Sequence, residues 1–149
     1  MGAKLLTKFG FLIIFDIGVV LNMDKKFIVG QEWNYETREG EENSTLKILK
    51  IDEIENTEKN IIHISISGLK IENPNNSAKY YKDLRHIPIC EKTLKNSVTK
   101  VKNEKSELPD FNEGYSIWKE AYEKKEAGFF TISVLEIVKF MDKTINQGI

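Results

Sequence analysis

The feature that most constrains this chain is a change in the spacing of its apolar residues near residue 90. Before that point apolar side chains recur at every second position, most regularly in "NIIHISISGLKI", where Ile62, Ile64 and Ile66 alternate with polar residues. Period two is typical of strands with one buried face. Beyond residue 90 the period becomes helical. This order predicts an α+β domain, with an antiparallel meander of three to four strands followed by about three helices packed on one face.

Four extended segments are predicted before residue 90, over residues 27–37, 45–54, 60–71 and 84–89. The first places Trp33 and Tyr35 on one face, with Glu32 and Asn34 on the other. The second changes phase after Ile48, which predicts a bulge or burial on both faces. Pro88 limits the fourth segment to an edge or a strand end. The stretch "ENPNNSAK" is rich in turn-forming residues and separates the third segment from the fourth.

The loop "REGEEN" between the first two segments carries Glu39, Glu41 and Glu42. Calcium loops spread Asp and Asn ligands over about a dozen residues, and this loop is too short to supply them. Gly40 suits a turn that requires positive φ, and the flanking charges suit a soluble tip. We therefore predict a solvated hairpin tip here.

Three helices are predicted after residue 90. Apolar spacing indicates one over residues 91–102. Asp110 and Glu113 resemble the capping box of a second helix over residues 110–126, and Ser133 and Glu136 resemble that of the last helix. The second helix carries an aromatic stripe, which we predict to lie in the core: Phe111, Tyr115, Trp118 and Tyr122. The buried face of the last helix is predicted to hold Val134, Val138, Met141 and Ile145.

Length and charge exclude several classes of protein. The 149 residues fit one globular domain, assigned to residues 25–149, that is large enough to bury a core. Acidic residues number 23 and basic residues 22, so the net charge is -1, and nothing favours nucleic acid, which is bound through clustered Lys and Arg. The single cysteine excludes an internal disulfide and a multi-cysteine zinc site. No cofactor is predicted.

Residues 1–24 resemble a targeting segment. Lys4 and Lys8 precede an apolar run, Phe9–Leu21, that has the length of a signal-peptide core but is shorter than the about 20 residues of a membrane span. Asp16 within the run and the lack of a small-x-small cleavage site oppose simple export. We predict a protein that is exported or tethered to a membrane through residues 9–21. The alternative is a cytoplasmic protein whose first segment packs on the domain.

Two stretches, "GQEWNYETREGEENSTLKILKI" and "LPDFNEGYSIWKEAY…GFFTISVLEIV", resemble a group of small bacterial proteins of unknown function that commonly carry an export signal. The resemblance covers roughly residues 27–141. It implies the boundary of the domain and export, and it assigns no activity and no site residue. The chain departs from the group in having neither a plain cleavage site nor a lipid-bearing cysteine.

Cys90 is the residue that most invites a catalytic interpretation. It precedes a predicted helix, whose free N–H groups favour thiolate, and His63 and His86 could act as its base. A thiol nucleophile also needs an orienting group and an oxyanion hole, and no motif marks either. Cysteine is often simply buried. A zinc site formed by the same three residues fits no compact ligand spacing.

The polar row of the third segment is His63, Ser65 and Ser67, and it lacks the acid of a Ser–His–Asp triad. We predict a solvated sheet face there. If the domain binds a partner, that face is the natural place, together with Glu32 and Asn34. The tryptophans, Trp33 and Trp118, are binding candidates where they reach the surface.

The sequence therefore predicts a non-enzymatic binding or interaction module, acting on an unknown protein or small ligand. Two alternatives stay open: an inhibitor of the toxin-immunity kind, which covers the site of an enzyme, and a thiol enzyme centred on Cys90.

Overall fold

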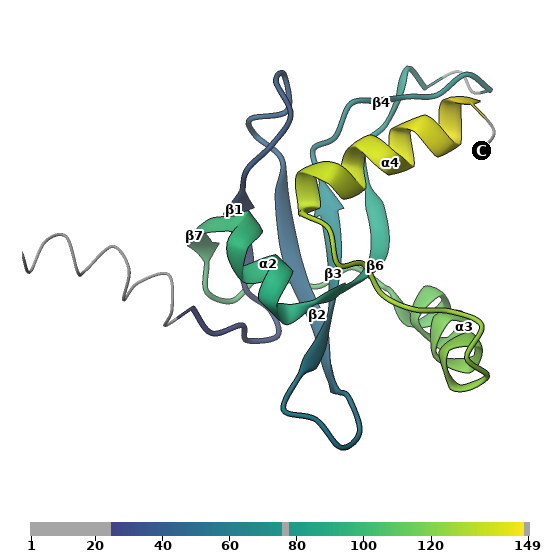
Figure 1. Ribbon diagram of the computed structural model, residues 1–149. Coiled ribbons are helices and arrows are strands. Elements are labelled where there is room, and N and C mark those ends of the chain that lie inside the picture. Colours follow the sequence, from purple (N-terminus) through teal and green to yellow (C-terminus); the bar gives the residue numbers. More distant parts are fainter. Residues whose placement is uncertain (1–24, 76–77, 148–149) are drawn as a thin grey trace, which may run out of the picture.

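The computed structural model describes residues 25–75 and 78–147. A five-stranded antiparallel sheet in the order β6-β3-β2-β1-β7 forms its centre, and a two-stranded ribbon of β4 and β5 lies beside it (Figure 1). The strands are β1 (Glu32–Tyr35), β2 (Thr45–Glu53), β3 (Asn60–Ser67), β4 (Ile71–Glu72), β5 (Tyr80–Tyr81), β6 (Leu84–Cys90) and β7 (Val98–Asn103), and the helices are α2 (Glu91–Ser97), α3 (Asn112–Glu123) and α4 (Val134–Gln147). The predicted α+β class with an antiparallel sheet is confirmed.

The long hairpin of β2 and β3 carries the core. Ile62, Ile64 and Ile66 are fully buried on one face of β3, as the alternation predicts. Leu46 and Ile48 of β2 lie opposite Ile66 and Ile64, so both strands turn their apolar side chains to the same face. Burial of these side chains, at about 25 cal/mol per Å² of apolar surface, supplies most of the driving force for folding.

Helix α4 packs on one face of the sheet, as predicted for the helices, whereas α3 lies against the opposite face. Val134, Ile137 and Val138 of α4 are buried in the apolar cluster that contains the isoleucines of β3. This confirms the predicted apolar face of the last helix, and the amide of Glu136 donates to Ser133 Oγ as its predicted cap requires. Helix α3 contacts the ring of His63, which alternation places on the opposite face. Figure 1 shows α3 well apart from α4.

The phase change in β2 is a β-bulge, as predicted. The register with β3 shifts between Ile48, which pairs with Ile64, and Lys50, which pairs with His63. Leu49 lies in the shift and is buried. Because of the extra residue, Lys50 and Asp52 lie on the same face as His63 rather than on the core face.

The predicted helix over residues 91–102 is wrong in its second half. Helix α2 ends at Ser97, and residues from Val98 continue as β7, which pairs with β1. Val98 and Val101 are β-branched, and Val98 reaches the core from a strand as readily as from a helix turn. The sheet gains its fifth strand in this way. The first extended segment is also shorter than predicted, because β1 begins at Glu32.

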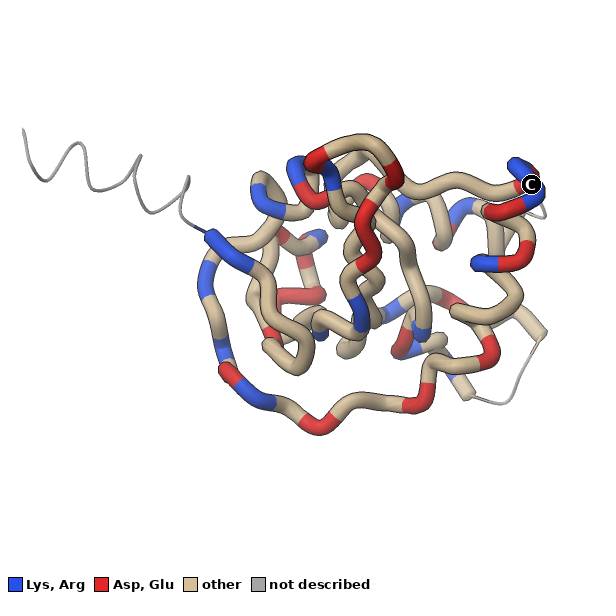
Figure 2. The backbone as a smooth tube through the Cα atoms, turned by 90° about the horizontal axis from the view of Figure 1, so that it is seen from below, with Lys and Arg blue, Asp and Glu red and all other residues tan. Residues whose placement is uncertain are grey.

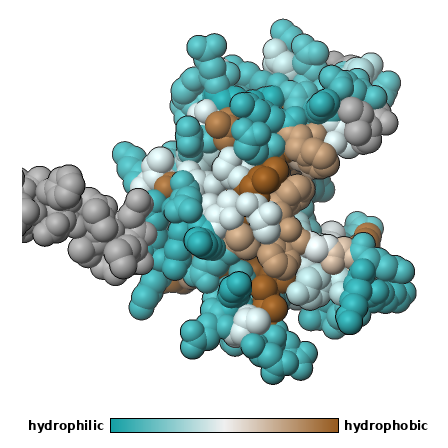
Figure 3. Space-filling view, viewed as in Figure 1, coloured by the Kyte–Doolittle hydropathy of each residue, from teal (hydrophilic) through white to brown (hydrophobic). Residues whose placement is uncertain are grey.

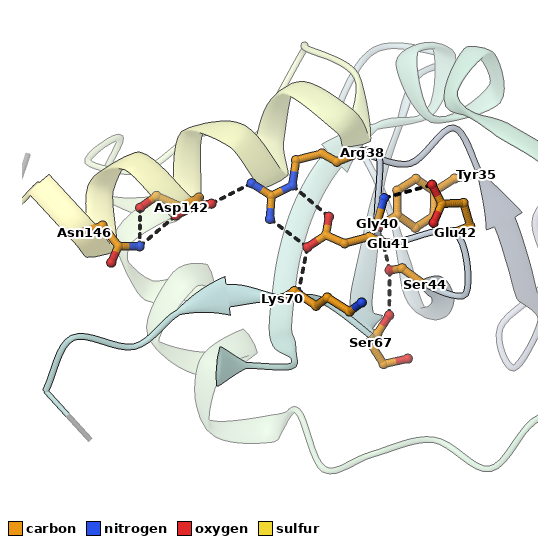
Figure 4. A network of polar contacts seen from close by, with 10 residues as sticks. All are labelled: Tyr35, Arg38, Gly40, Glu41, Glu42, Ser44, Ser67, Lys70, Asp142 and Asn146. Atoms are coloured by element: carbon orange, nitrogen blue, oxygen red, sulfur yellow. Dashed lines mark hydrogen bonds and ion pairs between the residues drawn. The ribbon is translucent and has the colours of Figure 1, made fainter. Parts of the chain in front are cut away.

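The tip of the β1–β2 connection is not solvated as predicted, because Glu41 is only 3% exposed. Figure 4 shows the guanidinium of Arg38 between two carboxylates, with Nε and Nη2 donating to Glu41 at 2.8 and 2.7 Å and Nη1 donating to Asp142 at 2.6 Å. The amide of Lys70 also donates to Glu41. The loop is thereby fastened to α4. Gly40 has the predicted positive φ, at 91°.

Gly68 ends β3 in a left-handed conformation with φ of 80°, where a Cβ would stand 3.0 Å from Ser44 Cα. We expect Gly68→Ala to lower the free energy of unfolding by more than the roughly 1 to 2 kcal/mol that left-handed backbone costs an L-residue. Gly40→Ala is the matched control, because Gly40 shares the conformation and has nothing within 4 Å of such a Cβ. Urea unfolding of both variants measures the difference. Equal losses would contradict a steric role for the Ser44 backbone.

The segment predicted to direct export lies in residues 1–24, outside the described residues. Among the helices that the structure describes, none combines the length and hydropathy needed to cross a membrane.

Candidate functional site

The polar row of β3 is covered rather than solvated. His63 has no exposed surface and Ser65 is buried, which corrects the prediction of an open face. The alternation itself is right, since both residues point away from the isoleucine core. The cover of His63 comes from α3, which folds back over the sheet more than forty positions later in the chain.

Five side chains from four elements meet under this helix, and we call them the paired-histidine cluster: Asp52, His63, His86, Tyr115 and Trp118. His63 Nδ1 lies 2.9 Å from His86 Nε2, and the two rings are stacked at 13°. His63 Nε2 lies 3.0 Å from Asp52 Oδ2, and the same oxygen accepts a 2.8 Å hydrogen bond from the Tyr115 hydroxyl. The edge of Trp118 contacts His63 at 4.7 Å between ring centroids.

The hydrogen bonds determine which nitrogens carry protons. A carboxylate only accepts, so His63 Nε2 must be protonated to donate to Asp52. In a neutral ring Nδ1 is then bare, and it accepts from His86 Nε2–H. His86 Nδ1 is left as the bare nitrogen of the pair, and none of the described residues donates to it. An added proton would therefore enter the cluster at this atom.

Burial sets the protonation state of the cluster. It lowers the pKa of His63, although the hydrogen bond to Asp52 opposes the shift. Burial, together with the neighbouring ring of His63, lowers the pKa of His86 to about 4. Burial and the hydrogen bond to Asp52 raise the pKa of Tyr115 to about 12. Both imidazoles are neutral at pH 7.

The aromatic stripe of α3 is not the core that its spacing predicts. Every side chain of the stripe is only partly buried, and α3 has no buried residue. Trp118 stacks on Tyr122 with 4.8 Å between centroids and donates from Nε1 to the carbonyl of Gly128. Gly114 lets the helix approach closely, because a Cβ there would stand 3.3 Å from His86 Cβ. Tyr115 and Trp118 of the stripe pack against both histidine rings, and we call this contact the aromatic clamp.

A polar cleft of about 480 Å³ lies next to the paired-histidine cluster. It begins at Ser65, which follows His63 by two residues and lies on the same face of β3. Ser65 and Ser67 form its floor, and the loop that leads into α3 forms a wall. We define the polar cleft by its lining residues: Lys47, Ser65, Ile66, Ser67, Asp83, Leu84, Arg85, Glu107, Leu108, Pro109 and Asp110. Lys47 Nζ donates to the carbonyl of Glu107 and so ties the wall to β2.

Acidic and basic side chains both line the polar cleft, and one of the basic side chains has no hydrogen-bond or ion-pair partner among the described residues. The Arg85 side chain makes no hydrogen bond or ion pair with any residue of the described ranges. Asp83, Glu107 and Asp110 supply carboxylates around it. Figure 2 shows the same mixture along the described part of the chain, with Lys and Arg interspersed among Asp and Glu.

The remaining predicted binding residues lie elsewhere. Glu32 accepts from Thr45 Oγ1 at 2.6 Å and from Ser106 Oγ at 3.3 Å, outside the lining of the polar cleft. Asn34 lines a separate shallow hollow near β7. Trp33 is 5% exposed and belongs to the core, with Nε1 donating to Gln31. It is therefore not a surface binding residue.

Cys90 lies apart from both histidines. Its Sγ is 2.9 Å from Thr93 Oγ1, whereas His86 is occupied by His63. Cys90 lines a second cleft of about 490 Å³, together with Ile54, Phe129 and three lysines. Figure 3 shows an apolar band crossing this face of the molecule. Ile132 and Phe140 are exposed, and Phe140 contacts Phe130 edge to face.

In the described part of the chain, no group of three or more His, Cys, Asp or Glu side chains could hold a metal ion. In comparisons with known proteins, no family model, no curated protein and no solved structure matches this chain. The site therefore has to be interpreted from its own chemistry.

The sequence missed the partners of His63 and the cations of the polar cleft. Asp52 joins His63 because of the bulge, and His86 because β6 pairs with β3 across Ile64 and Ile87. A single signal was available, the phase change in β2, which moves Asp52 to the polar face. Nothing in the spacing marks Arg85 or Lys47.

Proposed function

We propose that this protein is a non-enzymatic binding module whose working surface is the polar cleft. The observation that carries the proposal is Arg85, whose side chain has no partner among the described residues and which lines the same cleft of about 480 Å³ as Ser65 and Ser67. Small-ligand sites combine a concave surface with a few polar groups that fix orientation, and this cleft fits that description.

The ligand class follows from the charges. Two cations, Lys47 and Arg85, line the polar cleft with three carboxylates, so a simple anion would meet repulsion. A short peptide with both a positive and a negative end matches the mixture. The apolar side chains of Leu84 and Leu108 offer contact to a small side chain of such a peptide.

The chemistry of the histidines supports binding over catalysis. In the described residues, no serine or threonine hydroxyl and no thiol hydrogen-bonds to either imidazole, so neither ring is placed as the base for a nucleophile. The place of action, outside the cytoplasm or at its membrane, stays a prediction from residues 1–24.

A titration tests the proposal. Isotopically labelled protein is titrated with a pool of zwitterionic tripeptides and followed by amide NMR. We expect shifts at Ser65, Ser67, Arg85 and Asp110, and we expect Arg85→Ala to weaken binding about tenfold or more, since a hydrogen bond to a charged group contributes about 1.5 to 3 kcal/mol.

Lys139→Ala is the matched control for the loss of a positive charge, because Lys139 is half-exposed on α4 and pairs only with Glu136. It should bind as the unaltered protein does. Shifts confined to another surface, or equal affinity after Arg85→Ala, would reject the polar cleft as the site.

A specific observation also favours the inhibitor alternative. Exposed apolar residues that gather on one face mark protein interfaces more often than ligand sites, and Figure 3 shows an apolar band of this kind. Under that proposal a protein partner covers the face shown in Figure 3. The NMR titration separates the two, since a ligand in the polar cleft leaves the amides of this band unshifted.

A further inference from the structure

The paired histidines stand between the sheet and α3, which alone among the described helices has no buried residue. Helix α3 contacts them through Gly114, Tyr115 and Trp118. Its outer side is solvated, with Ile117 66% exposed. The docking of α3 therefore depends on a few contacts with two titratable rings.

The loop that precedes α3 is the wall of the polar cleft. Leu108, Pro109 and Asp110 line the cleft immediately before the helix begins at Asn112. The amide of Asn112 donates to Asp110, so the wall and the first turn of α3 are continuous. Movement of the helix away from the sheet would carry the wall with it.

We propose that the His63–His86 pair is a pH-sensitive latch, which holds α3 and the wall of the polar cleft in place while both rings are neutral and releases them when the pair gains a proton. The link to ligand binding rests on the proposed function of the polar cleft. The latch itself does not.

The geometry explains why a proton would open the latch. The proton enters at His86 Nδ1, on the side of the ring that faces Gly114. Among the described residues, no carboxylate contacts His86, and the one that contacts His63, Asp52, already accepts the hydroxyl of Tyr115 through the same oxygen, so the new charge has only a shared partner and gains from added contact with water. His86 is only partly exposed while α3 is docked, and movement of α3 would open the ring further to water.

Some of the charged groups around the pair favour its protonation and others oppose it. From β2, Asp52 favours a protonated His63 and Lys50 opposes it. From α3, Lys119 opposes protonation, and Tyr115 is neutral because its pKa is raised. The low pKa of His86, about 4 in the docked state, is consistent with a released state that binds the proton more readily.

The sign of the effect follows from this difference. A ring with an ordinary pKa near 6.5 in the released state and a lower value in the docked state favours docking above about pH 6.5, and the preference falls as the pH drops toward 4. The chain has only two histidines, so a titration between pH 5 and 7 belongs to this pair.

Hydrogen exchange of the free protein tests the latch without any ligand. Exchange rates are corrected for the chemical effect of pH and compared at pH 7.5 and 5.0. We expect the protection of peptides within residues 107–123 to fall about tenfold or more at pH 5.0, while peptides of α4 keep theirs. Unchanged protection of residues 107–123 would overturn the proposal.

His86→Gln is the matched variant, because the amide nitrogen can still donate to His63 Nδ1 but does not titrate. Its protection at residues 107–123 should fall much less at pH 5.0 than that of the unaltered protein, because the ring that takes up the proton is gone and only His63 still titrates, and an equal loss at pH 5.0 would overturn the latch. Nitrogen NMR of the unaltered protein gives a second measurement that needs no variant: His86 Nδ1 should be bare at pH 7.5, and a protonated Nδ1 would refute the assigned hydrogen bonds. Failure of tripeptide binding alone would reject the proposed function and leave the latch standing.

Discussion

Replacing Arg38 by alanine is expected to lower the free energy of unfolding by about 3 to 5 kcal/mol, the cost of leaving a buried charge without its partner. The charge that loses its partner is the carboxylate of Glu41, which is nearly inaccessible to solvent and receives two hydrogen bonds from Arg38. Burial would raise the pKa of Glu41, but Arg38 and the amide of Lys70 hold it below its ordinary value. This contribution to stability is present above pH 4.5 and is lost as the pH falls through the lowered pKa.

A double-mutant cycle with Glu41→Gln measures the pair in urea. Glutamine keeps an oxygen for the amide of Lys70 and carries no charge. Arg38→Ala should therefore cost much less in the Glu41→Gln background than in the unaltered protein. Equal costs in the two backgrounds would show that Arg38 acts through packing and Asp142 alone.

Ile64→Ala is expected to destabilise the domain by about 2 to 5 kcal/mol, the range for emptying a large site in a core that cannot collapse. Ile64 is fully buried at the centre of β3, with β2 on one side and β6 on the other. Because total stability is typically about 5 to 15 kcal/mol, the loss should be evident in the unfolding midpoint.

Ile117→Ala is the control for the same change of side chain. Ile117 lies on the solvated side of α3, and its replacement should alter stability by no more than about 0.5 kcal/mol. A large loss at Ile117 would mean that α3 packs through its outer side, contrary to the aromatic clamp described above.

The sequence predicted the fold where one local pattern decides the outcome. The alternation of Ile62, Ile64 and Ile66 identified the core face of β3, and the phase change in β2 identified the bulge. Ser133 identified the start of α4. In each case the residues that decide the structure are close together in the chain, so spacing and capping chemistry suffice.

Long-range pairing decided the structures that the sequence did not predict. Val98 satisfies a helical spacing with Leu94, yet β1 offers its backbone a partner and residues from Val98 form a strand. His63 has the phase of an exposed residue, yet α3 covers it. The polar cleft also depends on this cover, because its wall is the loop before α3. A periodic pattern states which face a residue occupies and carries no information on what lies over that face.

The order of the strands also determines when the sheet can be completed. Strand β1 lies between β2, its neighbour in sequence, and β7, whose residues follow only after α2. During synthesis the hairpin of β2 and β3 can close locally, while the outer edge of β1 stays unpaired until the chain has grown past Asn103. A nascent chain stalled before that point would expose the backbone of β1 to other chains.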